Sequence, residues 1–178
     1  MKAIIVFGTR GGATTAIAEE IGKALAEQGY ETTVRDVRNI RDINVKTFDL
    51  VIAGSSVWAA MWTRKASGFL KKNQSVLANK KVALFASGLS GADPTQRENS
   101  MKNYLEKAAA KYPAITPISL GLFGGYMDFN GPGLAVRLIG GAIKKDLQKK
   151  GVDTSKPHDT RDFAAIHQWA VEVAIKAR

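Results

Sequence analysis

The chain of 178 residues has an ordinary globular composition, with 45% hydrophobic and 24% charged residues and a net charge of +10. This composition argues against disorder, the length suits one domain, and the positive charge favours an anionic partner. Cysteine is absent, which excludes disulfides, thiolate nucleophiles and cysteine-ligated metal sites, and His158 and His167 lack metal-ligand spacing. No apolar run approaches the roughly 20 residues of a membrane-spanning helix. An apolar segment begins directly after Lys2, so we expect no signal peptide and a cytoplasmic protein. We also expect no bound metal.

The first half of the chain alternates between strand and helix patterns. Residues 3–7 form a continuous apolar run, which is typical of a strand buried on both faces of a parallel sheet. A helical period follows up to Gly29, and Thr14 or Thr15 is positioned to cap this helix. The next predicted elements are a strand over 30–37, a strand over 50–53 that ends in Gly54-Ser55-Ser56, and a helix over about 64–72.

The second half continues the alternation. Residues 81–86 predict a strand, and Pro94 and Thr95 open a long helix to about Lys111. Residues 115–123 predict a fifth strand with Pro117 near its start, where a missing N–H does little harm. The remaining predictions are a Gly-rich loop over 124–133, a helix over about 134–150, a loop over 151–161 and a terminal helix from about Phe163.

Five strands that alternate with helices require right-handed crossovers, and hence an open, parallel, doubly wound α/β sheet with helices on both faces. We expect residues 1–178 to form one such domain. Ligands bind these sheets at the carboxyl ends of the strands, where the strand order reverses. The loops after the first, third and fourth strands are therefore the candidate site.

The loop after the first strand has the composition of a phosphate site. Small residues and threonine hydroxyls surround a Gly11-Gly12 turn, and a helix N-terminus with free amides follows. The loop has neither the Lys-Ser/Thr pair of a Walker A motif nor a Gly-x-Gly-x-x-Gly fingerprint. The alternative is a plain strand-to-helix turn. Arg10 either offsets phosphate charge, contacts an anionic substrate or points to solvent. The candidate phosphate-binding residues are Thr9, Arg10, Gly11, Gly12, Ala13 and Thr14.

The string Phe7-Gly8-Thr9-Arg10-Gly11-Gly12-Ala13-Thr14 resembles the flavodoxin phosphate loop. It is most similar to that of the menaquinone-dependent protoporphyrinogen IX dehydrogenase family, with Gly8 in place of the first hydroxyl residue. Gly54-Ser55-Ser56, Phe69-Leu70-Lys71-Lys72 and the Thr-Asp-rich loop before Trp169 extend the resemblance over almost the whole chain. The resemblance implies a flavodoxin-like sheet of strand order 2-1-3-4-5 with one FMN as the cofactor.

The loop after the third strand carries two tryptophans, which are costly to expose without a purpose. Stacking of an aromatic ring on the flavin is favourable by roughly 0.5–1.5 kcal/mol beyond burial, and Trp58 is the first candidate and Trp62 the second. The alternative for Trp62 is packing under the following helix. The related dehydrogenases tend to place Tyr-Gly where this chain has Ala59-Ala60. The candidate flavin-binding residues here are Ser55, Ser56, Val57, Trp58 and Ala59.

Two further loops complete the candidate site. The loop after the fourth strand is small and flexible, so the backbone of Ser87, Gly88 and Leu89 is expected to contact the hydrogen-bonding edge of the flavin. Flavodoxins often have a tyrosine here, and this chain has none. Gly125 and Tyr126, after the fifth strand, are candidates to cover the open flavin face, with Phe129 as an alternative to Tyr126. Ordinary loop packing is the other reading of both aromatics.

Two classes of function remain open. The first is an FMN-dependent oxidoreductase that takes electrons from a substrate and passes them to a quinone or another acceptor, as the resemblance to the dehydrogenase family implies. The flavin would be its redox centre, and no catalytic residue is assigned in the protein. The second is a flavodoxin-type electron carrier that docks on a redox partner protein. Basic side chains are concentrated over 64–81 and 137–156, where they either keep the surface solvated or contact an anionic membrane surface. We expect no nucleic-acid partner.

Overall fold

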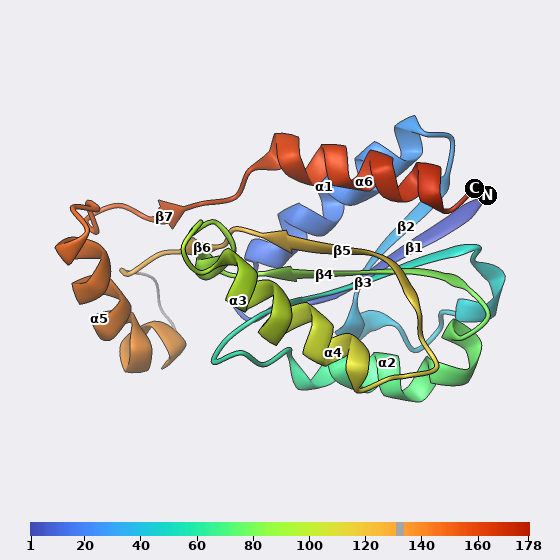
Figure 1. Ribbon diagram of the computed structural model, residues 1–178, viewed down its shortest axis with the longest axis horizontal. Coiled ribbons are helices and arrows are strands. Elements are labelled where there is room, and N and C mark those ends of the chain that lie inside the picture. Colours follow the sequence, from blue (N-terminus) through green and yellow to red (C-terminus); the bar gives the residue numbers. More distant parts are fainter. Residues whose placement is uncertain (131–133) are drawn as a thin grey trace.

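The computed structural model describes residues 1–130 and 134–178, and within the helix over 134–149 it describes the side chains only from Gly140 onward. Its centre is a parallel sheet of strand order β2-β1-β3-β4-β5 (Figure 1). The predicted fold class and strand order are thus confirmed. The five strands are β1 (Lys2–Gly8), β2 (Glu31–Asp36), β3 (Leu50–Ser56), β4 (Lys81–Ser87) and β5 (Pro117–Phe123).

The central strands are buried on both faces because they are apolar throughout. In β1, Ile4 and Ile5 point to opposite faces and both are fully buried. The carboxyl ends lie in register, since Gly8 of β1 pairs with Ser55 of β3, and Ser56 pairs with Ser87 of β4. This register brings the loops after β1, β3 and β4 to one edge of the sheet.

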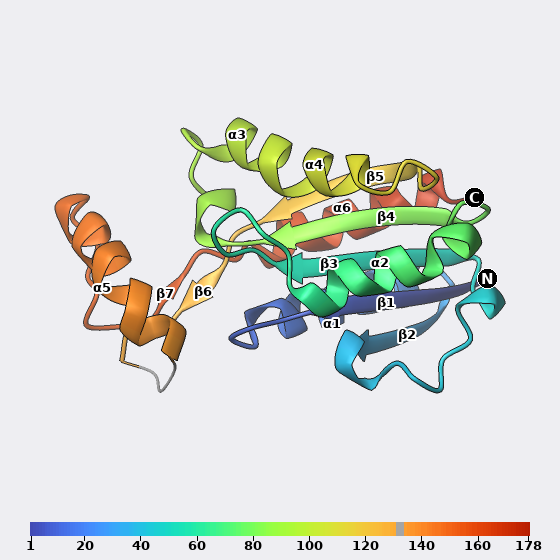
Figure 2. The ribbon, with the colours of Figure 1, turned by 90° about the horizontal axis from the view of Figure 1, so that it is seen from below.

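Two helical layers cover the sheet (Figures 1 and 2). On one face α1 (Ala13–Glu27) and α6 (Phe163–Lys176) pack through residues such as Ile21 and Val173. On the other face lies α2 (Arg64–Leu77), with Phe69 and Leu70 in the core. Short 3-10 turns occur at η1 (Val37–Asn39), η2 (Val45–Thr47) and η3 (Leu89–Gly91).

The predicted helix over 94–111 is not continuous. It consists of α3 (Arg97–Met101), a π-helical turn η4 (Lys102–Glu106) and α4 (Lys107–Ala110). The carbonyl of Tyr104, inside the π turn, accepts a 2.7 Å hydrogen bond from Trp62 Nε1. A tertiary contact thus satisfies a backbone group where the α-helical ladder is interrupted.

A projecting arm follows the fifth strand and was not predicted as such. The chain leaves the sheet as β6 (Tyr126–Met127), forms α5 (Leu134–Lys149) and returns as β7 (His158–Asp159), which pairs antiparallel with β6. The helix agrees with the prediction, whereas β6 and β7 lie in segments predicted as loops. In Figure 1, α5 stands beyond the carboxyl ends of the strands, away from both termini. We call residues 126–159 the arm.

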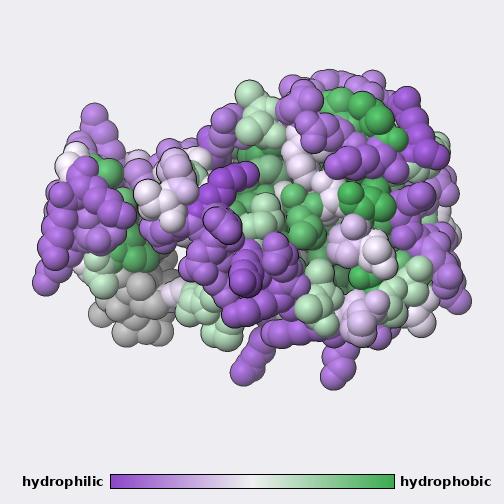
Figure 3. All heavy atoms as spheres, in the orientation of Figure 1, coloured by the Kyte–Doolittle hydropathy of each residue, from purple (hydrophilic) through white to green (hydrophobic). Residues whose placement is uncertain are grey.

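The arm forms a distinct lobe with a mainly hydrophilic visible surface (Figure 3). Part of the predicted Gly-rich loop, over 131–133, lies outside the described residues. The side chains over 134–139, including Arg137 of the predicted membrane-facing segment, also lie outside them.

Candidate functional site

A cavity of about 940 Å³ lies where the carboxyl ends of the strands meet the arm. Its body-side wall is built from the loops after β1, β3 and β4, and its other wall includes Tyr126, His158 and α5. Of the candidate residues, Gly12 and Ser55 do not line it, and neither do the alternatives Trp62 and Phe129. The candidates that line it are Thr9, Arg10, Gly11, Ala13, Thr14, Ser56, Val57, Trp58, Ala59, Ser87, Gly88, Leu89, Gly125 and Tyr126.

The loop after β1 presents a helix N-terminus to the cavity. Gly12, with φ of +84°, is the N-cap of α1, and its amide donates a 2.9 Å hydrogen bond to Thr9 Oγ1. The helix begins at Ala13, so the prediction that Thr14 or Thr15 caps it is wrong. A left-handed backbone at this position favours glycine, so Gly12 allows the chain to turn sharply from the loop after β1 into α1. Among the described residues the amides of Gly11 and Ala13 have no hydrogen-bond acceptor, which suits an anion.

Thr14 points across the sheet rather than along its own loop. Its side chain is fully buried, and its Oγ1 lies 3.0 Å from Ser87 Oγ at the end of β4. The two hydroxyls join the first and third loops of the site. The sequence predicts a capping role for Thr14 because it does not show that the Ser87 hydroxyl at the end of β4 lies within hydrogen-bond distance.

Gly8, at the end of β1, leaves room for the side chain of Thr63. A Cβ at Gly8 would lie 2.1 Å from Thr63 Oγ1, so the Thr63 side chain occupies that space. Thr63 Oγ1 also caps α2 by accepting a hydrogen bond from the amide of Ala66.

Ser55 and Ser56 end β3 with different roles. Ser55 is fully buried, and its Oγ accepts from the Thr63 amide at 2.9 Å and donates to the Ser56 carbonyl at 2.9 Å. Ser56 lines the cavity, and its Oγ is buried and has no hydrogen-bond partner among the described residues. A buried polar group without a partner costs about 1–3 kcal/mol. A ligand in the cavity could supply the missing hydrogen-bond partner.

The two tryptophans of this loop lie in different environments. Trp58 is half-buried and lines the cavity, within a tight turn closed by hydrogen bonds between the backbones of Trp58 and Met61. Ala59 and Ala60 occupy the turn centre with φ of 48° and 59°. This left-handed backbone costs a non-glycine residue of order 1–3 kcal/mol, and it is the conformation that a glycine at the second position would ease. Trp62 is 8% exposed and packs with the core beneath α2.

Arg10 braces the turn that carries Trp58. Its guanidinium donates hydrogen bonds to the carbonyls of Ser56 at 2.9 Å and Trp62 at 3.3 Å, with a longer pair to Met61. Burial lowers the pKa of Arg10, although the group stays a cation far above neutral pH. Sequence reasoning offered phosphate, substrate or solvent as its neighbour. It missed this role because backbone carbonyls leave no pattern in a sequence.

The loops after β4 and β5 touch one another closely. A Cβ at Gly91 would lie 2.3 Å from the carbonyl oxygen of Phe123, so only glycine permits this approach. Gly125 exchanges hydrogen bonds with the hydroxyl of Thr160 through its amide and its carbonyl, each at 3.0 Å. These contacts hold the base of the arm against the site.

Tyr126 projects from the arm with 38% of its surface exposed. Arg161 lies over its ring at 5.2 Å from the centroid and forms a two-point ion pair with Asp159. The hydrogen bonds from Arg161 lower the pKa of Asp159. Tyr126 is thus oriented by a cation, whereas Phe129 is half-buried and does not line the cavity.

Sequence reasoning missed several polar groups that line the cavity, some in the segment after β4 and some on the arm. Asp93 lies in an exposed turn, where hydrogen bonds from Thr95 and Gln96 lower its pKa to about 2. Lys150, just beyond α5, forms ion pairs with Asp93 at 3.7 Å and Asp146 at 3.3 Å. These pairs join the arm to the loop after β4. The other missed lining residues with polar side chains are Ser90, Gln96, Asp128, His158 and Thr160.

The family assignment agrees with this geometry. A helix N-terminus faces a cavity at the carboxyl ends of a parallel sheet of order 2-1-3-4-5, which is a flavodoxin-like arrangement. The model of the flavodoxin domain family matches residues 4–154, and the chain belongs to this family.

Individual relatives are more distant. Protoporphyrinogen IX dehydrogenase [quinone] of Escherichia coli is 28% identical over 107 residues, which cover 60% of this chain and 59% of that protein. The alignment thus spans less than two thirds of this relative. An archaeal flavodoxin has the same fold at 20% identity, with a TM-score of 0.55 and coverage of 99% of both chains. A Lactobacillus acidophilus flavoprotein in complex with FMN is 15% identical, with a TM-score of 0.53, over 68% of this chain and 92% of that one.

The described residues contain neither a membrane-spanning helix nor a metal-binding cluster. None of their helices combines the length and apolarity that crossing a membrane requires. Within the same residues, no cluster of His, Asp and Glu side chains is arranged to hold a metal ion.

Proposed function

We propose that the cavity binds one FMN and that the protein is an FMN-dependent oxidoreductase with a quinone as its electron acceptor. The observation that carries the cofactor assignment is the buried, unpartnered Ser56 hydroxyl beside the free amides of the first loop. Both need an acceptor, and the positive end of α1 favours an anion at that point. The phosphate of FMN supplies both. Flavodoxin family membership and the FMN complex of a structural neighbour support this choice.

The rest of the cavity suits the flavin ring. In the proposed arrangement Trp58 stacks on one face, and Arg10 and the Ala59-Ala60 turn fix the position of Trp58. Backbone groups of Gly88 and Leu89 contact the edge of the ring, and Tyr126 approaches from the arm. Bound FMN would supply hydride and single-electron transfer, while these residues orient it and exclude water.

Two observations favour an enzyme over a carrier. The cavity continues past the three loops to the arm, where His158 and Asp128 line it, so there is a wall for a substrate beside the flavin. The similar Escherichia coli protein is named as a quinone-linked dehydrogenase of protoporphyrinogen IX. A quinone acceptor resides in the bilayer, and exposed Lys145, Lys149 and Lys156 give the arm a basic surface for a peripheral contact at the inner face of the membrane.

The second candidate is a flavodoxin-type electron carrier. The observation that favours it is Ala59-Ala60, which departs from the Tyr-Gly of the dehydrogenase branch in the turn that contacts the flavin. A carrier would need a redox partner protein with an acidic docking surface, given the net charge of +10.

The test has two stages. Cofactor released from purified protein is identified by mass spectrometry, and FMN rather than FAD is expected because the first loop holds a single phosphate. Quinone-dependent oxidation of protoporphyrinogen is then measured under anaerobic conditions. Turnover supports the enzyme. FMN binding with no turnover, together with reduction by a flavodoxin reductase, supports the carrier, and stoichiometric FAD without FMN contradicts the site assignment.

A further inference from the structure

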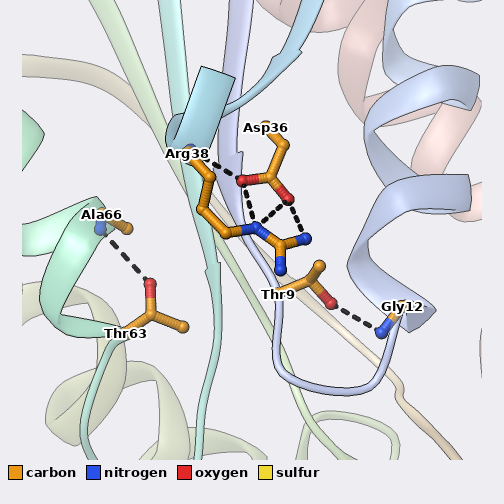
Figure 4. A network of polar contacts seen from close by, with 6 residues as sticks. All are labelled: Thr9, Gly12, Asp36, Arg38, Thr63 and Ala66. Atoms are coloured by element: carbon orange, nitrogen blue, oxygen red, sulfur yellow. Dashed lines mark hydrogen bonds and ion pairs between the residues drawn. The ribbon is translucent and has the colours of Figure 1, made fainter. Parts of the chain in front are cut away.

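A second hollow, of about 410 Å³, lies on the other side of the loop after β1. Thr9 and Arg10 line both this hollow and the cofactor cavity. Its other walls come from the end of β2, which contributes Asp36, from the 3-10 turn η1, which contributes Arg38, and from the first turn of α2, which contributes Arg64 and Lys65. Figure 4 shows the Arg38 side chain lying between the first loop and the start of α2. The proposed function uses none of these β2, η1 and α2 side chains.

The hollow is strongly basic. Four cationic side chains line it, and Asp36 is the one acid among its lining residues. That acid is committed to Arg38, whose Nε lies 3.0 Å from both carboxylate oxygens and whose terminal nitrogen lies 2.6 Å from Oδ2. Burial alone would raise the pKa of Asp36, but the hydrogen bonds from Arg38 and the charges of Arg38 and Lys65 lower it. Asp36 therefore stays ionised and orients Arg38, which remains 59% exposed.

The start of α2 adds positive potential to the same place. Arg64 and Lys65 occupy its first turn, which holds no acid, and neither makes an ion pair among the described residues. Cations at a helix N-terminus oppose the helix dipole, which favours acids there. Two cations without an ion pair among the described residues, a third oriented cation and a helix N-terminus thus lie at one hollow, and each of them favours an anion there.

We propose that this hollow binds a dianionic phosphate group at a site separate from the phosphate of FMN. A phosphate monoester matches the set because guanidinium groups donate paired hydrogen bonds to its oxygens, and a lysine adds a compact charge. Two sources share this chemistry, a phosphorylated nucleotide and free inorganic phosphate. Since the hollow adjoins the cofactor cavity through Thr9 and Arg10, a ligand held there by its phosphate lies beside the flavin site. The assignment stands on its own geometry and does not require FMN.

The test is calorimetric titration of the FMN-saturated protein with inorganic phosphate, adenosine 2′,5′-bisphosphate and adenosine at low salt. Saturation with FMN occupies the first loop, so further phosphate binding reports the second hollow. The double variant Arg64→Gln/Lys65→Gln is expected to weaken phosphate binding roughly tenfold or more, because it removes two charged donors. The matched control is Lys71→Gln/Lys72→Gln, which removes the same charge from exposed positions of the same helix outside the hollow. This control variant is expected to change the affinity for phosphate by less than twofold, because its lysines act on the hollow only through the long-range electrostatic field.

The titrations distinguish a phosphorylated nucleotide from inorganic phosphate as the ligand, and they separate the anion site from the proposed FMN site. Tighter binding of the bisphosphate than of phosphate assigns the hollow to a phosphorylated nucleotide, and equal binding assigns it to free phosphate. Adenosine is expected not to bind. Equal weakening by the two double variants, or no phosphate binding by the unaltered protein, overturns the proposal. If FMN itself does not bind, the proposed function fails, and the same variants titrated with phosphate in the cofactor-free protein still decide the anion site.

Discussion

The sheet body and the arm meet at one cavity, but they are built in different ways. The body side rests on strands whose residues, such as Ile5 and Ile52, are fully buried. The arm rests on a two-stranded ribbon with Tyr126 exposed, and it is joined to the body by Thr160 and the Lys150–Asp93 ion pair. Stability is not uniform across a structure, and regions with few buried apolar contacts open first. Among the described residues, the body side of the cavity is therefore expected to be the more stable wall and the arm the less stable one.

The largest expected difference between the two regions is in global stability. Ile52→Ala, in the central strand β3, is expected to lower the free energy of unfolding by about 2–5 kcal/mol, because it leaves a cavity in the core. Lys156→Ala, at an exposed arm position, is expected to change it by less than about 0.5 kcal/mol. Urea denaturation followed by circular dichroism measures both. Similar losses in the two variants would mean that the arm is part of the cooperative core.

A second prediction compares two hydroxyls on the body side of the cavity. Ser56→Ala is expected to weaken FMN binding by roughly 10- to 150-fold, since a hydrogen bond to a charged group contributes about 1.5–3 kcal/mol. It is expected to leave the stability of the cofactor-free protein unchanged or higher, because it removes a buried group without a partner.

Thr14→Val is the matched variant for Ser56→Ala. It removes the partner of Ser87 and is expected to lower the stability of the cofactor-free protein by about 1 kcal/mol. FMN affinity comes from fluorescence titration and stability from thermal unfolding. Loss of stability in Ser56→Ala with unchanged FMN affinity would remove Ser56 from the phosphate site.

The strands and most helices could be predicted because apolar period and turn residues determine them locally. Three features could not. The ribbon of β6 and β7 is two residues long on each side, too short to show a period. The π turn at Tyr104 depends on Trp62, which is distant in sequence. The left-handed turn at Ala59-Ala60 is hidden because alanine, unlike glycine, does not signal that conformation.

The candidate site was predictable at the level of loops but less so for individual side chains. The carboxyl ends of parallel strands meet at one edge, so nearly all candidate residues do line one cavity. The roles of Arg10 and Thr14 depend on partners in other loops, at the Ser56 carbonyl and the Ser87 hydroxyl. Such long-range partners are set by register, which a single sequence does not show.

Limited proteolysis tests whether the arm opens more readily than the sheet body. Trypsin is expected to cleave the arm first, at Lys145, Lys149 or Lys156, because these exposed residues lie where the structure opens most readily. FMN is expected to slow this cleavage several-fold if it binds as proposed, because Tyr126 and His158 of the arm line the same cavity. The measurement is the time course of fragments by mass spectrometry. First cleavage within α2, which carries exposed Lys71 and Lys72, would reverse the assignment of the less stable region.

The smallest expected effect concerns the membrane. If the basic side chains of the arm contact anionic lipid, the protein binds anionic vesicles at low salt with roughly 1 kcal/mol per engaged lysine or arginine. Binding should fade at high salt, because the screening length falls from about 10 Å at 0.1 M to about 3 Å at 1 M. Vesicle co-sedimentation measures this, with neutral vesicles as the control. No sedimentation with anionic vesicles at low salt would favour the electron carrier.

The most direct test of the central claim is a titration of the cofactor-free protein with FMN, followed by tryptophan fluorescence. The chain has three tryptophans, and only Trp58 lines the cavity in the described residues. We expect saturable quenching at one FMN per chain, with most of it lost in Trp58→Phe and retained in Trp62→Phe. Unchanged quenching in Trp58→Phe, or no saturable FMN binding, would contradict the assignment of this cavity as the flavin site.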